Sequence, residues 1–242
     1  MRNYAIVTAA GKGTRFGSNK ALYPLLGKPL LVWSLEVFSK VVDEIWITCP
    51  ENFHEEYRVA GSGFHNVNFI SGGETRYKSV RRAFEVLGSD GIVLIHDAAR
   101  PLLSRDLVER VMRATTEYGA AIPVLPVTDT VKEVEDERII RTVPREHLYL
   151  AQTPQGFRCA LLKDAYSKVE GTDLTDEAMI VELAGHPVHC VPGERTNLKI
   201  TEPSDIALAE FYLQKETLPA SVGSGIRARR GQGRPRYKSG EP

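Results

Sequence analysis

The stretch "VTAAGKGTRFGSNK", Val7 to Lys20, joins a short apolar run to a glycine-rich, basic loop. Similar apolar runs recur along the chain, separated by segments with the apolar spacing of helices. The predicted strands are "YAIVT" (4–8), "EIWITC" (44–49), "NVNFI" (66–70), "GIVLIHD" (91–97), "AAIPVLP" (120–126), "PVHCV" (187–191) and "NLKIT" (197–201). Helices are expected over about 30–38, 75–87, 104–119, 159–169, 175–184 and 204–215. This alternation predicts a doubly wound, mostly parallel α/β sheet with helices on both faces.

The opening loop is a candidate phosphate site, because ligands of open α/β sheets bind past the carboxyl ends of the strands. Gly11 and Gly13 would let backbone N–H groups approach an anion, and Lys12, Arg15 and Lys20 would add positive charge. The loop matches neither GxxxxGK[ST] nor GxGxxG, since Phe16 stands where the second motif needs a glycine. A solvated turn with scattered cations is the alternative interpretation.

Two more loops are expected at the same edge of the sheet. In "SGGETRYKS", Gly72 and Gly73 together with Arg76 and Ser79 could present backbone groups to a flat base. In "HDAARP", Asp97 and Arg100 follow a buried strand, where catalytic residues are common, although a structural salt bridge or a helix cap is the alternative.

Residues 129–143, "DTVKEVEDERIIRTV", interrupt the α/β pattern with alternating apolar and polar residues, which predicts a β-hairpin. A hairpin with so little apolar content needs another surface to lean on, and a partner subunit is one candidate. We therefore expect a single domain over residues 1–213, with a protruding hairpin arm at about 127–150. Six of the last nineteen residues are basic and few are large and apolar, so residues 214–242 are expected to form a disordered basic tail.

Composition excludes several classes of protein. The 242 residues are 42% apolar and 26% charged, and they contain no apolar run long enough to span a membrane. No signal-peptide pattern precedes the first strand, which predicts a cytoplasmic protein. The three cysteines form no CxxC pair, and neither GxSxG nor HExxH occurs. The acids of "DLTDEA" are interpreted as the start of a helix capped by Thr175, and no metal site is predicted from protein side chains.

Seven motifs occur in one order along the chain: "AAGKGTRFG…K", "GGETRYKSV", "HDAARP", "PVTDTVK", "LAQTPQGF", "LTDEA" and "NLKIT…D…LAE". Together they resemble the 2-C-methyl-D-erythritol 4-phosphate cytidylyltransferase family over about residues 3–213. The ribitol-5-phosphate cytidylyltransferases share most of these motifs, but Ala98 and Ala99 favour the methylerythritol family.

The resemblance implies an enzyme with a Rossmann-like nucleotidyltransferase fold. It would transfer a cytidylyl group from CTP to methylerythritol 4-phosphate and release pyrophosphate, in the non-mevalonate pathway to isoprenoid precursors. Mg²⁺ would be held mainly by the CTP phosphates, and the hairpin arm would join two copies of the chain into a homodimer. The nucleophile is a phosphate monoester, largely ionised at neutral pH because its second pKa is ~6, so no general base is needed.

The resemblance also assigns roles to residues of this chain. The catalytic cations would be Arg15, Lys20 and Lys199. The nucleotide would be bound by Ala9, Ala10, Gly11, Gly13, Gly72, Gly73, Glu74, Ser79, Asp97 and Ala98. The sugar phosphate would be held by Arg100, Thr130, Arg145, Thr175 and Lys199, with Arg145 serving the neighbouring subunit's site.

The chain departs from the family pattern beside Lys20, where Asn19 and Ala21 replace the usual Pro and Gln. The basic tail also lies outside the pattern. Besides the ribitol-phosphate enzyme, a different class stays open: a catalytically silent protein that binds nucleotides, or nucleic acid through the tail. Nucleic acid is the less favoured partner, and no membrane partner is expected.

Overall fold

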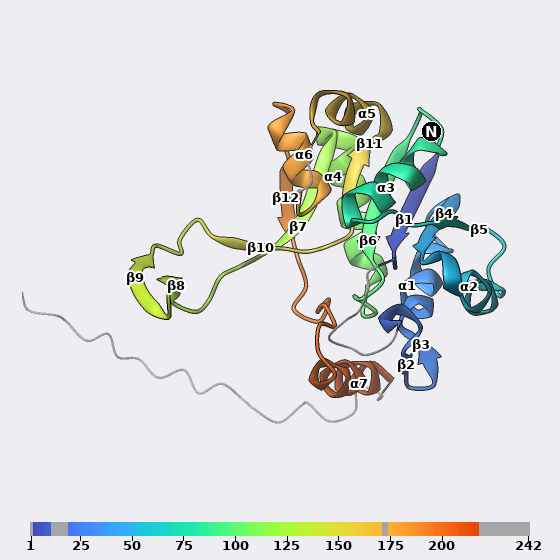
Figure 1. Cartoon of the computed structure of the whole chain (residues 1–242), viewed down its shortest axis with the longest axis horizontal. Helices are drawn as coiled ribbons and strands as arrows, with labels where there is room; N and C mark the ends of the chain where they lie inside the picture. The colour runs from blue at the N-terminus through green and yellow to red at the C-terminus, as the bar shows by residue number, and fades with distance from the viewer. Residues whose placement is uncertain (1, 11–18, 171–173, 218–242) are drawn as a thin grey trace, which may run out of the picture.

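The computed structural model describes residues 2–10, 19–170 and 174–217, and its central sheet is shown in Figure 1. The strands of this sheet are β1 (Asn3–Thr8), β4 (Glu44–Cys49), β5 (Val67–Ser71), β6 (Ile92–Asp97), β7 (Ala120–Pro126), β10 (Tyr149–Ala151), β11 (Gln155–Arg158) and β12 (His189–Pro192). Their order is β10-β7-β11-β6-β1-β4-β5, and β12 also pairs with β7. Two short hairpins pair β2 (Pro24–Leu25) with β3 (Lys28–Pro29), and β8 (Val131–Glu135) with β9 (Arg138–Val143).

The helices connect these strands. They are α1 (Leu30–Phe38), α2 (His54–Gly61), α3 (Arg76–Glu85), α4 (Arg105–Tyr118), α5 (Cys159–Lys168), α6 (Glu177–Leu183) and α7 (Ser204–Thr217). Two short 3₁₀ turns, η1 (Lys20–Leu22) and η2 (Glu51–Phe53), complete the described elements. None of the helices in the described ranges is long and apolar enough to cross a lipid bilayer.

Strand β1 lies in the interior of the sheet and is parallel to both of its neighbours. Its residue Ala5 is opposite Ile45 of β4 and Leu94 of β6. The doubly wound, mostly parallel sheet predicted from the sequence is confirmed. Strand β11 was not predicted, and it pairs antiparallel with both β6 and β7.

Strands β1 and β6 are buried on both faces of the sheet, which explains their near-continuous apolar sequences. Side chains alternate along β1, so Ala5 and Val7 pack in one core cluster with residues of α1, α2 and α4. Tyr4 and Ile6 pack in a second cluster with residues of α3, α5 and α6. The helices therefore cover opposite faces of one sheet and leave its edges for loops.

Helix α7 packs away from the main sheet, against the β2–β3 hairpin and the start of α1 (Figure 1). Ala209 and Leu213 of α7 share a buried cluster with Leu25 and Ile200. Because α7 continues to Thr217, residues 214–217 belong to this helix, and the expected tail from 218 onward lies outside the described residues.

Two local expectations were wrong, and one helix was missed. Residues 197–201 form no strand; instead, Ile200 N–H donates to the Ala99 carbonyl at 2.7 Å, so the segment is held without a ladder of strand hydrogen bonds. Thr175 does not cap α6, because the carboxylate of Asp176 accepts the Met179 N–H at 3.0 Å. Helix α2 was not predicted at all.

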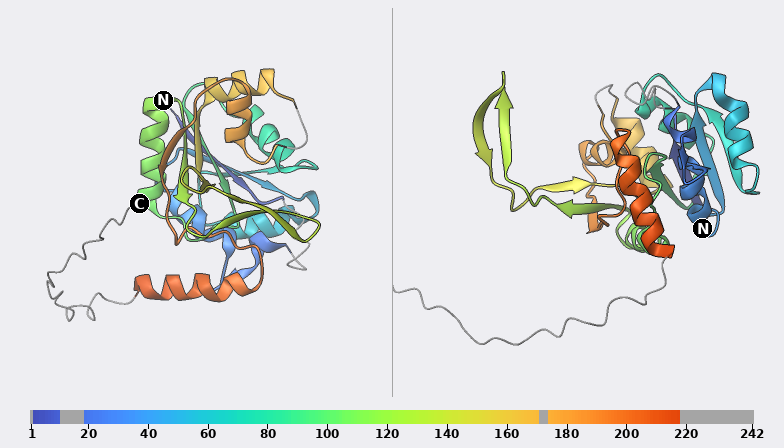
Figure 2. Two further views of the ribbon diagram at one scale, coloured as in Figure 1. Left: turned by 90° about the vertical axis from the view of Figure 1, so that its left-hand side faces the viewer. Right: turned by 90° about the horizontal axis from the view of Figure 1, so that it is seen from below.

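The predicted hairpin arm is present and stands apart from the sheet, as the right-hand view of Figure 2 shows. Strands β8 and β9 pair antiparallel with an irregularity between Glu133 and Val134. Val134, Ile139 and Ile140 are all more than half exposed. An arm with exposed apolar side chains is suited to packing against a second surface.

Candidate active site

The carboxyl ends of β1 and β6 border a cavity of about 460 Å³. Its lining comes from four segments that are far apart in sequence: Thr8–Ala10, Lys20–Ala21, residues 73–79 and Asp97–Ala99, joined by Lys199. This is the edge of the sheet at which ligands of doubly wound folds bind. The described residues here include most of the predicted nucleotide-binding set: Ala9, Ala10, Gly73, Glu74, Ser79, Asp97 and Ala98.

A smaller cavity of about 160 Å³ adjoins the first and shares Arg76, Asp97 and Lys199 with it. It contains Arg100 and Thr175, two residues predicted to hold the sugar phosphate. Two compartments that meet at one charged wall can hold two reactants against each other. A separate cavity of about 290 Å³ between α3 and α5 has none of the predicted site residues among its described lining.

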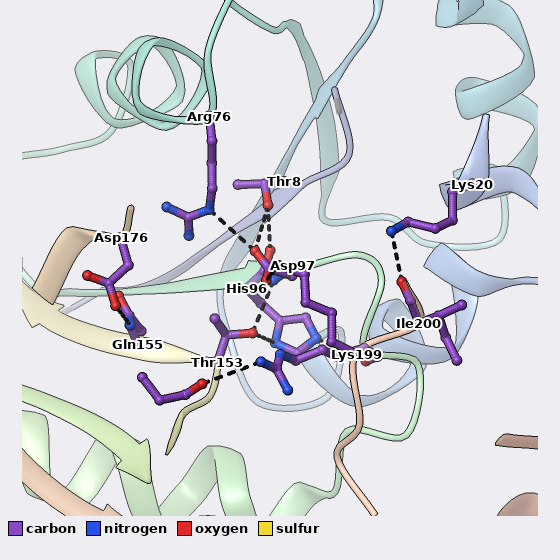
Figure 3. Close-up of polar contacts among 12 residues, drawn as sticks. Thr8, Lys20, Arg76, His96, Asp97, Thr153, Gln155, Asp176, Lys199 and Ile200 are labelled. Atoms are coloured by element: carbon purple, nitrogen blue, oxygen red, sulfur yellow. Dashed lines mark hydrogen bonds and ion pairs between the residues drawn. The ribbon is translucent and has the colours of Figure 1, made fainter. Parts of the chain in front are cut away.

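Asp97 is the centre of the shared wall (Figure 3). Its Oδ2 lies 2.8 Å from Lys199 Nζ, and its Oδ1 lies 3.4 Å from Arg76 Nε. Thr8 Oγ1 donates to the same Oδ1 at 3.3 Å. Burial alone raises the pKa of Asp97, but Arg76 and Lys199 more than offset this and hold the pKa below its usual range. The carboxylate is therefore ionised at neutral pH and keeps Lys199 at the boundary of the two cavities.

Arg76 also forms a deeply buried ion pair. Its Nη1 lies 2.7 Å from Glu177 Oε2, and the Glu177 side chain is only 1% exposed. Burial raises the pKa of Glu177, while Arg76 beside it opposes that rise. One guanidinium thus connects the first turn of α6 to Asp97 at the end of β6.

His96 is hydrogen-bonded to residues that line the smaller cavity but does not line either cavity. Its Nε2–H donates to the Arg100 carbonyl at 3.1 Å, and its Nδ1 accepts from the Thr153 hydroxyl at 3.0 Å. That hydroxyl in turn accepts the Asp97 N–H at 3.2 Å. Burial lowers the pKa of His96 to about 4, so the imidazole is neutral at physiological pH. His96 is therefore a buried residue of the strand end, and it is not among the described residues that line the two cavities.

Lys20 and Lys199 converge on one short segment (Figure 3). Lys20 begins η1, and its Nζ donates to the Ile200 carbonyl at 2.8 Å. Lys199, the preceding residue in the chain, reaches Asp97. Two of the three predicted catalytic cations are thereby placed at the same cavity, although they lie far apart in sequence.

The glycines of the loop after β5 permit a close approach of backbone segments. A Cβ on Gly72 would lie 2.3 Å from the Ala10 Cβ, and one on Gly73 would lie 2.5 Å from the Lys78 Cβ. The Gly73 N–H donates to Ser79 Oγ at 2.9 Å, and that hydroxyl donates to the Thr75 carbonyl at 2.8 Å. Ser79 thus fixes the shape of the loop that lines the cavity.

Other predicted residues are not in these cavities. Thr130 and Arg145 lie on the exposed arm, where the Arg145 guanidinium donates to the Thr128 carbonyl. Gly11, Gly13 and Arg15 lie outside the described residues.

Sequence reasoning missed the pairing of Arg76 with Glu177. Arg76 was predicted only as part of the loop that faces a flat base, and Glu177 was interpreted as an acid in the first turn of a helix. The sequence did contain a signal that Glu177 is buried, because four apolar residues follow it directly in "EAMIVEL". A buried carboxylate of this kind requires a cation, but the sequence does not identify which one.

The described part of the chain contains no group of three or more His, Cys, Asp or Glu side chains that could hold a metal ion. Asp97 is the carboxylate that both cavities share, and it is already paired with two cations. Any divalent ion at this wall would therefore need most of its oxygen ligands from water and from a bound phosphate compound.

A cavity at the carboxyl edge of a doubly wound sheet, with lysines directed at its wall, defines a Rossmann-like nucleotidyltransferase. The sequence model of the 2-C-methyl-D-erythritol 4-phosphate cytidylyltransferase family matches residues 4–215. The chain belongs to this family.

Individual relatives agree with the family match. The chain is 40% identical over 237 residues to the 2-C-methyl-D-erythritol 4-phosphate cytidylyltransferase of Acidobacterium capsulatum, covering 90% of this chain and 99% of that one. The crystal structure of the Thermus thermophilus protein of the same name matches with a TM-score of 0.75 at 40% identity, covering 88% of this chain and 100% of that one. The 4-diphosphocytidyl-2C-methyl-D-erythritol synthase of Anaerococcus prevotii matches with a TM-score of 0.78 at 30% identity, covering 88% and 98%.

Proposed function

We propose that this chain transfers the cytidylyl group of CTP to 2-C-methyl-D-erythritol 4-phosphate and releases pyrophosphate. The observation that carries the proposal is the pair of adjoining cavities that share Asp97, Arg76 and Lys199. One cavity is lined by the residues predicted for the nucleotide, and the other contains residues predicted for the sugar phosphate. The names of the relatives identify the transferred group, cytidylyl, and its acceptor, 2-C-methyl-D-erythritol 4-phosphate.

The reaction is an in-line displacement at the α-phosphorus of CTP. An oxygen of the substrate's phosphate forms a bond to that phosphorus, and the bond from the phosphorus to the bridging oxygen of the β-phosphate breaks. Pyrophosphate leaves with the electron pair. The attacking phosphate is already largely ionised, since its second pKa is ~6, so the protein has no proton to remove.

Catalysis therefore depends on charge and position. The two reactants are both anionic and repel each other. Cations at the point of contact lower that repulsion and stabilise the charge that is spread over the transition state. Lys199 is held at the boundary by Asp97 at 2.8 Å, and Lys20 is held beside it by the Ile200 carbonyl at 2.8 Å. In our proposal both ammonium groups turn to the reacting phosphates when the substrates bind, and Arg15 adds a third cation.

The nucleotide would lie between the end of β1 and the glycine loop. The close approach of Gly72 to Ala10 suits a flat base that is read by backbone groups. Asp97, with Ala98 beside it, would face the ribose. On the other side of the shared wall, Arg100 and Thr175 would hold the methylerythritol phosphate.

Thr130 and Arg145 would act across a dimer. They lie on an arm that projects away from the sheet of their own chain (Figure 2), with exposed apolar residues available for a second copy. In our proposal each arm completes the sugar-phosphate subsite of its partner. A cytoplasmic location remains a prediction.

Mg²⁺ is the proposed cofactor, held mainly by oxygens of CTP. The residues present fit this arrangement, because Asp97 can offer one carboxylate and a bound triphosphate supplies the remaining anionic oxygens. When bound, the ion would neutralise part of the triphosphate charge.

The test is incubation of the purified protein with CTP, methylerythritol 4-phosphate and Mg²⁺. We expect equal amounts of pyrophosphate and of a cytidine diphosphate product, identified by its mass, and no pyrophosphate when the sugar phosphate is omitted. Folded protein that releases no pyrophosphate with both substrates present would contradict the proposal.

A further inference from the structure

The hydroxyl of Tyr57 contacts two segments that flank the nucleotide cavity. Tyr57 lies on α2, and its side chain is fully buried in the core cluster that also contains Ala9 and Ala21. Its hydroxyl lies 3.1 Å from the Ala9 carbonyl oxygen and 2.8 Å from Oδ1 of Asn19. One side chain therefore joins the end of β1 to the residue immediately before Lys20.

Asn19 sets the backbone direction at Lys20. It precedes η1, and its carbonyl accepts the Leu22 N–H at 3.1 Å. Its side chain makes no capping hydrogen bond to this turn, and its backbone has φ −67° and ψ 95°. The Asn19 amide is thus directed to Tyr57 rather than to the turn that it begins.

The Tyr57 hydroxyl cannot donate a hydrogen bond to both of its partners at once. A phenol carries one hydrogen, so it can donate to either Ala9 or Asn19 at a given moment. A half-turn of the Asn19 amide presents Nδ2 to Tyr57, which then accepts from Asn19 and donates to Ala9. In this arrangement Nδ2, which is otherwise unpaired among the described residues, takes the place of Oδ1 as the atom paired with Tyr57. Burial raises the pKa of Tyr57, so the hydroxyl keeps its hydrogen throughout the physiological range.

We propose that Tyr57 and Asn19 form a positioning pair that fixes Lys20 relative to the end of β1. The proposal rests on the transfer reaction inferred above and identifies what holds one of its cations. A lysine side chain is long and flexible, so its ammonium group can be placed only if its backbone is fixed. The φ of −67° at Asn19 is the angle that a proline ring imposes. Here the hydrogen bond to Tyr57 performs the restraint that a ring would provide.

The variant Tyr57→Phe isolates the hydroxyl, because the ring remains to fill the core. We expect kcat to fall about tenfold, as for loss of one buried hydrogen bond, with little change in the KM for the sugar phosphate. Adding Asn19→Pro to Tyr57→Phe should restore most of the lost kcat, since proline fixes the same φ without needing a partner. Tyr4→Phe is the matched control, a buried tyrosine in the other core cluster for which no hydroxyl hydrogen bond is seen in the described residues.

A second measurement separates this proposal from the proposed function. Amine-labelling rates, read by mass spectrometry, report the mobility of Lys20 without any turnover. In Tyr57→Phe we expect Lys20 to label several-fold faster than in the wild type, and the exposed Lys40 to label at an unchanged rate. Unchanged labelling of Lys20, or a kcat equal to that of Tyr4→Phe, would overturn the positioning role. A different pair of results would overturn the proposed function and not the positioning role. In that case the wild type would fail to turn over CTP, while Lys20 would still label faster in Tyr57→Phe than in the wild type.

Discussion

Replacing Glu177 with alanine tests whether its buried ion pair with Arg76 stabilises the folded protein. The Glu177 side chain is 1% exposed and the Arg76 side chain is 26% exposed, with 2.7 Å between their charged atoms. Without Glu177, Arg76 would keep Asp97 as its carboxylate contact among the described residues, at 3.4 Å. The cost of the substitution is therefore the cost of leaving a largely buried guanidinium with one weaker partner.

The structure indicates the size of this cost. Removing one partner of a buried ion pair destabilises a protein by about 3–5 kcal/mol. Because Arg76 keeps Asp97 and some solvent contact, we expect the lower end of that range, about 3 kcal/mol, in the free energy of unfolding. For a chain of this length the melting temperature should fall by roughly 6–12 °C. Glu177→Gln keeps the shape and an acceptor, so it should cost about half as much.

Urea unfolding followed by the fluorescence of Trp33 and Trp46 measures this free energy. Glu182→Ala is the matched control, since Glu182 is an exposed acid on the same helix. It should stay within about 0.5 kcal/mol of the wild type. If Glu177→Ala and Glu182→Ala unfold at the same urea concentration, the buried pair does not stabilise the fold and our reasoning is refuted.

Three further predictions concern activity, pH and assembly. Lys20→Ala and Lys199→Ala should each lower kcat by about 10²–10³ with folding intact, and near-wild-type steady-state rates in both would contradict their roles. In the unfolded chain His96 binds a proton near its ordinary pKa, but in the folded protein it does so only near pH 4. The free energy of unfolding should therefore rise with pH between about 4 and 6.5, by up to about 3 kcal/mol. An unfolding free energy that stays flat across that window would contradict a buried neutral imidazole. Arg145→Ala should raise the KM for the sugar phosphate while light scattering still shows a dimer, and a monomeric wild type would count against the arm as a shared element.

The layered fold could be predicted because its signal is local. Apolar runs such as "GIVLIHD" are buried on both faces, and a strand of that kind implies helices above and below the sheet. Strand β11 had no such signal. Its place depends on Gly156, where a Cβ would lie 2.1 Å from Thr115 Oγ1, so the absence of a side chain lets α4 pack closely on the strand. Contacts of this kind depend on residues about forty positions apart and leave no periodicity.

The residues of the candidate site also fall into those that the sequence identified and those that it did not. Motif order identified Asp97, Lys20 and Lys199, and the structure brings them to one cavity. It could not identify the partners that position them, because the sequence does not show which distant cation a buried carboxylate faces. Glu177 is the clearest case, since only the folded chain shows that its carboxylate faces Arg76. Tyr57 is another, because its hydroxyl has no visible role until folding brings Ala9 and Asn19 to it.

The most direct test of the central claim compares kcat/KM for methylerythritol 4-phosphate and for ribitol 5-phosphate, with CTP and Mg²⁺, and then replaces CTP by the other nucleoside triphosphates. Our account predicts a higher kcat/KM for methylerythritol 4-phosphate and for CTP. A preference for ribitol 5-phosphate, or equal use of all nucleotides, would contradict it.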